Sequence, residues 1–226
     1  MLKFYFNDTP NPTKIALFLE EAGLPYEPVP IDVRKGEQFA PAYLAINPNG
    51  KVPAIVDDGV AVFDSNAILL YLAEKTGKFL PAPGEEARAE LLSWLMFAAT
   101  GLGPFCGQAV HFRHYAPGEN AYALKRYQHE AFRHFAVLNQ RLAARRYMLG
   151  DTYTIVDMDI WGWTRAAPRI LGDDAWENFP DLKRLVDEIS ARPAAQRAAA
   201  LKENYTFKTE MDAETYGHLF KHIEVM

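Results

Sequence analysis

The chain has 226 residues, enough for one large domain or two modest ones, and its 49% hydrophobic and 23% charged residues are an ordinary globular balance. A formal net charge of -5 argues against a nucleic-acid binder, which usually carries a basic excess. The single cysteine excludes an intrachain disulfide and a cysteine-rich metal site, and it suits a reducing compartment. With no secretory signal and no long apolar run in the sequence, we expect a soluble, cytoplasmic protein with no membrane or nucleic-acid partner.

The first part of the chain begins with strand and helix signals. Residues 2–6 alternate in side-chain character, which predicts a strand, and a helix-spaced apolar series then runs from Pro12 to Gly23. Residues 27–32 form the next strand candidate. This segment contains two prolines, which cannot donate to a sheet ladder, so we expect it at a sheet edge.

A hairpin and a helix complete this first part. Residues 52–56 and 60–63 flank Asp57-Asp58-Gly59, which is a hairpin signal, and residues 65–75 form an amphipathic helix. The element order β-α-β and then β-β-α predicts a mixed four-stranded sheet. The arrangement is that of a thioredoxin-like domain, over residues 1–80.

The second part of the chain is predicted to be all-helical. It follows a linker at Pro81-Ala82-Pro83-Gly84 and extends over residues 86–226, including a polar-aromatic tail from Glu203. Thr154 and Asp157 have the spacing of a capping box, which we interpret as structural. Apolar residues recur at helical spacing in five segments: 86–110, 121–145, 154–171, 180–191 and 194–203.

Three segments of the first part are candidates for a single binding site. In the first, Val52-Pro53, a cis peptide bond would turn the Val52 backbone groups outward to pair with an extended peptide. In the second, Asp64-Ser65, free N–H groups at the start of a helix would hold a ligand carboxylate while Asp64 pairs with its ammonium group. The alternatives are an ordinary trans proline, and a simple N-cap at Ser65.

The third segment is the loop Asp8-Thr9-Pro10-Asn11, which follows the first strand. Hydrogen-bond donors here would favour a bound thiolate over the less nucleophilic thiol, and Thr9 and Asn11 supply a hydroxyl and an amide. A turn that only caps the following helix is an equal alternative on local sequence. The loop lacks the Cys-x-x-Cys of a redox thioredoxin, so the thiol has to belong to the ligand.

Together these segments make the chain similar to the cytosolic glutathione transferases over essentially its whole length. It most resembles the bacterial Nu class, which are glutathione-dependent disulfide-bond reductases. The Nu-like stretches are Thr9-Pro10-Asn11, Lys35–Phe39, Gly101–Phe105, Gly107-Gln108 and Arg126-Tyr127-Gln128. Residues 47–53 and 64–68 have counterparts in many classes and indicate glutathione binding without indicating the class.

The resemblance implies a role for each matched residue. Thr9 and Asn11 would contact the glutathione sulfur, and Val52-Pro53 would pair with its cysteinyl backbone. The remaining assignments are Gln38 and Lys51 at the glycyl end, Asp64 and Ser65 at the γ-glutamyl head, and Arg126 reaching the ligand from the helical part, in the same subunit or from the partner of a homodimer.

Other residues are weaker candidates for the chemistry. Tyr5 could be a tyrosine that activates the thiol, although packing is the default for a strand aromatic. Cys106 is expected to be a small buried hydrophobe. His111 and His114 lack an evident third ligand, so we expect no metal.

The sequence therefore predicts an enzyme with glutathione as cosubstrate that reduces small disulfides, with glutathione disulfide among its ligands. Conjugation of electrophiles to glutathione and a non-catalytic glutathione carrier are the alternatives.

Overall fold

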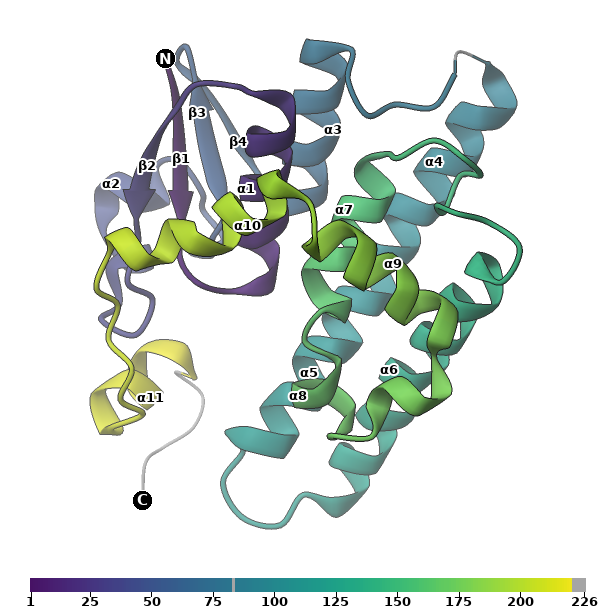
Figure 1. The fold of residues 1–226 in the computed structure, drawn as a ribbon. Coiled ribbons are helices and arrows are strands. Elements are labelled where there is room, and N and C mark those ends of the chain that lie inside the picture. Colours follow the sequence, from purple (N-terminus) through teal and green to yellow (C-terminus); the bar gives the residue numbers. More distant parts are fainter. Residues whose placement is uncertain (83, 221–226) are drawn as a thin grey trace. The chain divides into compact units, whose positions relative to one another are not determined.

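The computed structural model of the chain describes residues 1–82 and 84–220, and they form two compact units (Figure 1). The first unit combines residues 1–72 with the segment from Pro193 onward, and the second covers residues 73–192. A mixed sheet followed by an all-helical part confirms the predicted fold class. The division into units differs from the predicted limits of 1–80 and 86–226 at its C-terminal end, where the segment from Pro193 joins the first unit.

The first unit is built on a four-stranded sheet in the order β2-β1-β3-β4. β1 pairs with β2 in parallel and with β3 in antiparallel register, and β3 and β4 form an antiparallel hairpin. The proline-containing β2 lies at an edge, as predicted. The strands are β1 (Leu2–Phe6), β2 (Tyr26–Pro30), β3 (Ala54–Asp57) and β4 (Val60–Phe63).

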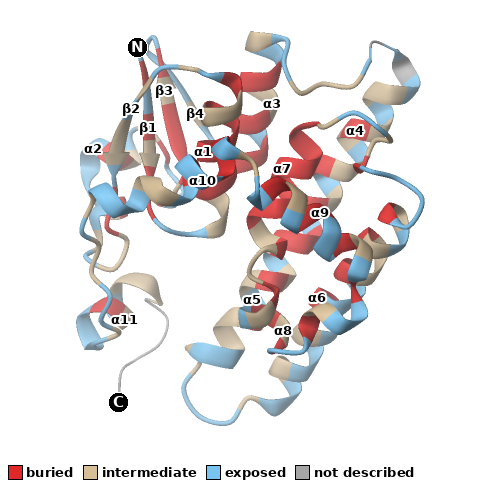
Figure 2. Ribbon diagram, viewed as in Figure 1, coloured by how far each residue is buried: buried red, intermediate tan, exposed pale blue. Residues whose placement is uncertain are grey.

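Burial in this unit is concentrated in β1, β3 and the helices α1 and α3 (Figure 2). Alternation along β1 puts Leu2, Phe4 and Phe6 inside, which is the predicted strand pattern. α1 ends at Gly23, whose φ of 65° is readily adopted only by glycine. The helices are α1 (Pro10–Ala22), η1 (Glu37–Phe39), α2 (Pro41–Leu44), α3 (Ser65–Thr76), α10 (Pro193–Ala200), η4 (Leu201–Asn204) and α11 (Ala213–Leu219).

The second unit is helical throughout its regular elements. Its helices are α4 (Glu85–Phe97), η2 (Ala98–Leu102, a π-helical turn), α5 (Gly103–His114), α6 (Ala121–Leu142), α7 (Ile155–Thr164), α8 (Ala167–Leu171), η3 (Ala175–Asn178) and α9 (Pro180–Ser190). The prediction of one helix over 154–171 was wrong, because the chain breaks between α7 and α8. Pro168 causes the break: its ring would clash with the carbonyl of residue 164 in a continuous helix.

The predicted capping box at the start of α7 is present. The Asp157 carboxylate accepts hydrogen bonds from the Thr154 N–H at 2.8 Å and the Met148 N–H at 2.8 Å, and both residues of the box are buried. Burial raises the pKa of Asp157 to about 6. The box fixes the Met148 segment to the start of α7, which is a structural role.

The helical stretch Glu86–His114 is long and apolar enough to cross a membrane by length and composition. The core helix of a globular protein meets the same criteria. Leu91, Leu95 and Leu102 in this stretch are fully buried, as expected of a core helix.

Candidate functional site

The candidate segments of the first unit all follow one edge of its sheet. Tyr5 near the end of β1 lies opposite Val29 of β2 and Ala54 of β3, and Ala54 lies opposite Phe63 of β4. β1, β2 and β4 therefore end, and β3 begins, at the same edge. The chain segments attached there are the loop after β1, the loop after β2, the turn before β3 and the start of α3, so residues distant in sequence share one rim.

The loop after β1 carries Thr9 and Asn11. Thr9 is the N-cap residue of α1, but its side chain makes no capping hydrogen bond. Its hydroxyl instead donates to Asn7 Oδ1 at 2.6 Å, and the Asn7 side chain is buried. Thr9 is exposed and Asn11 is half-buried in the first turn of α1. The helix starts at Pro10, two residues before the predicted opening at Pro12.

The turn before β3 is fixed by side chains of the preceding segment. The Val52–Pro53 peptide bond is cis, which is the geometry that the predicted pairing of Val52 needs. The Lys51 carbonyl accepts a hydrogen bond from the Tyr43 hydroxyl at 2.7 Å and another from Asn47 Nδ2 at 2.6 Å. These two bonds hold the backbone immediately before Val52 and leave the Lys51 side chain exposed at the rim.

Tyr5 packs beneath this turn rather than in the loop after β1. Its ring lies 5.7 Å from that of Tyr43, centroid to centroid, and it joins a cluster with Ile31 and Val52. These contacts support the packing role that a strand aromatic usually has.

The start of α3 is capped by Asp64 and not by Ser65. Asp64 has a φ of 70°, which is unusual for a residue with a side chain. Its Oδ1 accepts hydrogen bonds from the N–H groups of Asn66 at 2.9 Å and Ala67 at 3.2 Å. Asp64 is exposed, so its carboxylate lies at the surface of the rim beside the helix N-terminus, while Ser65 is buried.

A buried cation lies behind this helix start. Lys14 of α1 is 2% exposed, and its Nζ donates to Asn66 Oδ1 at 2.6 Å. The Ser65 hydroxyl also donates to that oxygen, at 3.4 Å. A buried ammonium group adds to the positive potential that helix N-termini carry. The first turn of α3 is thus backed by positive charge.

Gln38 lies in the segment after β2 and is 3% exposed. Its Nε2 donates to the Val33 carbonyl at 3.1 Å, whereas its Oε1 is buried with no hydrogen-bond partner among the described residues. A buried acceptor without a partner is uncommon in folded proteins, and such atoms are concentrated at functional sites. The donor that would complete Gln38 has to come from outside the described residues.

Arg126 lies in α6 of the second unit, apart from the other candidates in sequence and in unit. Its Nη1 pairs with Glu130 Oε1 at 2.7 Å, and Glu130 also accepts a hydrogen bond from Arg133. Cys106 of α5 is fully buried, as predicted, and burial raises the pKa of its thiol. No group of three metal-ligating side chains occurs in residues 1–82 and 84–220.

Lys14, Asn66, Tyr43 and Asn47 support the rim, but the sequence analysis did not single them out. Lys14 had a visible signal, since it interrupts the apolar face of the helix that Ile15 and Phe18 define. Tyr43 and Asn47 had none, because their partner is a backbone carbonyl.

The comparison with protein families decides what this arrangement belongs to. A model of the glutathione S-transferase N-terminal domain matches residues 1–74, and a model of the C-terminal domain of the same proteins matches residues 101–193. The chain belongs to the glutathione S-transferase family. The predicted resemblance is confirmed, and the protein is an enzyme of that family.

Two Escherichia coli relatives carry the same designation. The chain is 46% identical over 205 residues to the disulfide-bond oxidoreductase YfcG, which covers 88% of this chain and 94% of that protein. It is 39% identical to the disulfide-bond oxidoreductase YghU over 87% of this chain and 73% of that protein.

Solved structures of other family members superpose well. A glutathione transferase from Burkholderia graminis with two glutathione molecules bound per subunit has a TM-score of 0.81 and 37% identity, over 88% of this chain and 87% of that one. A glutathione transferase from Pseudomonas putida with one glutathione disulfide per subunit has a TM-score of 0.81 and 34% identity, over 88% and 90% of the two chains.

Proposed function

We propose that this transferase-family enzyme binds glutathione at the rim of its sheet and uses the glutathione thiolate to reduce small disulfides. The observation that carries the proposal is the loop after β1. It presents the polar side chains of Thr9 and Asn11 but no cysteine, and the chain's single cysteine is fully buried in the other unit. The reactive thiol then has to be supplied by the ligand.

The arrangement of charge at the rim suits each end of glutathione. The start of α3, backed by Lys14, would hold the γ-glutamyl carboxylate, and the exposed Asp64 would pair with the ammonium group. Val52-Pro53 would pair with the cysteinyl backbone, and Gln38 and Lys51 would meet the glycyl end. The unpartnered Gln38 Oε1 supports contact with a ligand N–H, because a carbonyl oxygen can accept but not donate.

The Thr9 hydroxyl would change partner when glutathione binds. It now donates to Asn7 Oδ1. Hydrogen bonds to an ionised acceptor are about twice as strong as bonds between neutral groups. A thiolate placed beside Thr9 would therefore draw the hydroxyl away from Asn7, and the same interaction would favour ionisation of the thiol.

The reaction that follows is thiol–disulfide exchange. The bound glutathione thiolate attacks one sulfur of the substrate disulfide, forms a mixed disulfide and releases the other sulfur as a thiolate, which takes up a proton. A second glutathione thiolate then attacks the glutathione sulfur of the mixed disulfide. This step releases the second substrate thiol and glutathione disulfide. The relatives named as disulfide-bond oxidoreductases support this reaction over conjugation.

We also propose that the enzyme works as a homodimer in the cytoplasm, and that Arg126 contributes to the ligand site from its own subunit or from the partner.

The decisive experiment compares two glutathione-dependent activities, reduction of 2-hydroxyethyl disulfide and conjugation of a model aryl halide. In Thr9→Ala and Asn11→Ala we expect kcat/KM for disulfide reduction to fall roughly 10- to 100-fold, since a hydrogen bond to a charged group contributes about 1.5–3 kcal/mol. Thr9→Ser retains the hydroxyl and is the matched control. Conjugation without disulfide reduction would contradict the proposal, turnover of neither substrate would favour a carrier, and unchanged rates in both alanine variants would place the sulfur elsewhere.

A further inference from the structure

The C-terminal segment Tyr205–Leu219 lies against two of the rim loops. It follows α10 and η4, belongs to the first unit, and carries α11 at its end (Figure 1). Its sequence alone predicts no regular structure beyond a polar-aromatic tail.

The first contact of the segment is with the end of β1. The Phe6 ring packs edge-on against Tyr205 at 5.3 Å and against Phe207 at 6.0 Å, measured between ring centroids. Phe6 is 3% exposed and directly precedes the loop that carries Thr9. Just before the segment, Lys202 Nζ pairs with Asp8 Oδ2 at 3.0 Å in the same loop. That pair is exposed and contributes little, so the aromatic contacts are the main link.

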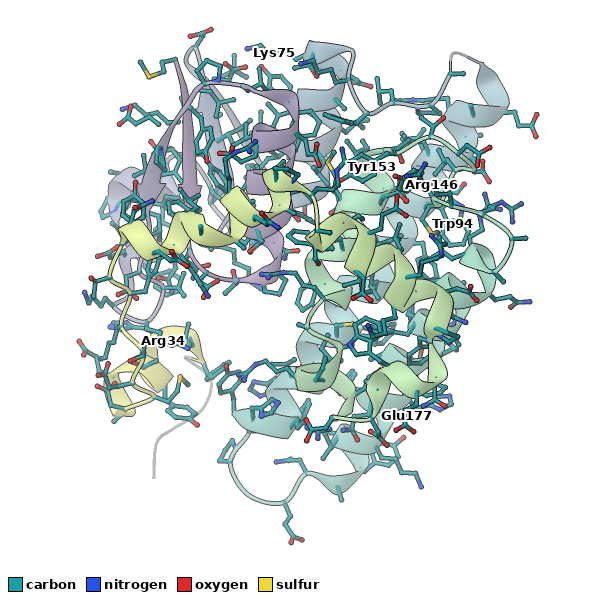
Figure 3. All side chains as sticks on the ribbon, in the orientation of Figure 1. Arg34, Lys75, Trp94, Arg146, Tyr153 and Glu177 are labelled. Carbon is teal, nitrogen blue, oxygen red and sulfur yellow. The ribbon has the colours of Figure 1, made fainter. Side chains whose placement is uncertain are left out.

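The second contact is with the loop after β2. The Lys208 N–H donates to Asp32 Oδ2 at 2.7 Å, and the Lys208 carbonyl accepts from Arg34 Nη1 at 2.7 Å. Arg34 therefore reaches from this loop to the C-terminal segment (Figure 3). Asp32 is buried, and its Oδ1 also accepts the Arg34 N–H at 3.1 Å. One carboxylate thus joins the fold of the loop to the backbone of the segment.

The segment stabilises its own fold around the same residue. Lys208 Nζ lies 2.8 Å from Asp212 Oδ2 and 2.8 Å from Glu214 Oε2, with its side chain only 13% exposed. The hydrogen bond from Lys208 lowers the pKa of Asp212 to about 2. Asp212 also caps α11 by accepting the Thr215 N–H at 2.9 Å, and Thr215 is fully buried. The segment is therefore an ordered part of the unit.

A close approach at Gly36 completes the contact. A Cβ atom built at Gly36 would lie 2.6 Å from His218 Nδ1, so α11 packs directly on the backbone of the loop. Gly36 has a φ of 80°, which favours glycine independently of this contact. Two residues later comes Gln38, the buried residue whose Oε1 has no partner in the described residues.

We propose that the C-terminal segment Tyr205–Leu219 is a positioning element of the glutathione site, which holds the loop after β2 so that Gln38 meets the glycyl end of the ligand. This inference rests on the proposed glutathione site. Without the segment the loop would lose both hydrogen bonds to Lys208 and the packing of His218 on Gly36. The ligand would then have to order the loop as it binds, and such ordering lowers affinity.

The test compares glutathione with γ-glutamylcysteine, which lacks the glycyl residue. In a chain ending at Asn204 we expect the Kd for glutathione to rise roughly tenfold, while the Kd for γ-glutamylcysteine changes less than about twofold. Amide exchange in residues 32–38 should accelerate in the same protein. Circular dichroism checks that the shortened chain is folded.

A point variant keeps the test valid if the shortened chain does not fold. Arg34→Ala in the full chain removes the bond to the Lys208 carbonyl and should reproduce the selective loss for glutathione at a smaller size, roughly twofold to fivefold. Arg88→Ala, which removes an exposed ion pair with Glu74 in the second unit, is the matched control and should change neither Kd. Equal weakening for both peptides, or no change for either, would overturn the positioning role. Failure of the full-length protein to bind glutathione would instead contradict the proposed function.

Discussion

His134 of α6 is a buried titratable residue whose surroundings favour its neutral form. It is 3% exposed and lies between the rings of Phe97 and Phe105, with centroid distances of 4.9 and 5.2 Å. Nδ1 lies 2.7 Å from the Glu130 carbonyl and can donate to it, whereas Nε2 lies 3.5 Å from Arg133. Burial lowers the pKa of His134, and the positive charge of Arg133 acts in the same direction.

This depressed pKa predicts a loss of stability in mild acid. Below a pH of about 6.5 the unfolded chain takes up a proton at this position, while the folded chain does not until the pH reaches its lower pKa. The free energy of unfolding should therefore decrease as the pH falls from 7 to 5, and His134→Gln should decrease less over the same interval. Denaturant unfolding at several pH values measures the difference between the two proteins. Parallel curves would contradict a neutral buried His134.

At the scale of elements, strand and helix identities could be predicted because they depend on local patterns. The alternation along β1, the prolines of β2 and the Asp58-Gly59 turn, where both residues have positive φ, each have a local physical cause. Other features depend on contacts that the sequence does not display. The π-helical turn η2 between α4 and α5 is one of these, and it lies against the ring of His134.

Gly101 in this turn is expected to resist substitution for a steric reason. An alanine Cβ there would clash with His134 Nε2, and the buried ring has little room to move. Helix propensity alone favours alanine over glycine by about 1 kcal/mol. Overpacking of a tight core site costs about 1–3 kcal/mol, so the clash should prevail and Gly101→Ala should be less stable than wild type.

Gly107 in α5 is the matched control, because the nearest atom to its added Cβ would be Trp163 Cη2 at 3.6 Å, an ordinary contact. Gly107→Ala should be neutral or more stable, by up to about 1 kcal/mol. Thermal and denaturant unfolding of both variants checks the pair. A stabilised Gly101→Ala would mean that the ring of His134 relaxes at little cost.

At the scale of the whole molecule, some features of the site are written in short stretches of sequence and others arise only on folding. The motifs at Thr9, Val52-Pro53 and Asp64-Ser65 are contiguous, so they could be recognised from the order of residues alone. That Asp64 rather than Ser65 caps α3 could not, since the choice depends on a positive φ at Asp64. Nor could the docking of residues 205–219 on the first unit, because its contacts with Asp32 and Arg34 join residues 176 and 174 positions apart.

The surface of the first unit bears on the proposed homodimer. β4 is an edge strand, and Val60 and Phe63 on it are 53% and 43% exposed. An edge strand with exposed apolar side chains is prone to associate with another chain unless it is covered. In the second unit Met96 and Phe132 are exposed large apolar residues as well. Pairing of two copies would remove such surface from water.

The chain of 25.5 kDa should therefore sediment as a species of twice that mass. Phe63→Glu should shift the equilibrium towards monomers, because it places a charge where apolar contact is expected. Ala42→Glu, which places the same charge at an exposed position of α2 in this unit, is the control and should leave the dimer intact. Sedimentation over a range of protein concentrations separates the outcomes. A wild-type protein that remains monomeric at micromolar concentration would contradict the homodimer and would require Arg126 to act, if it does, within its own subunit.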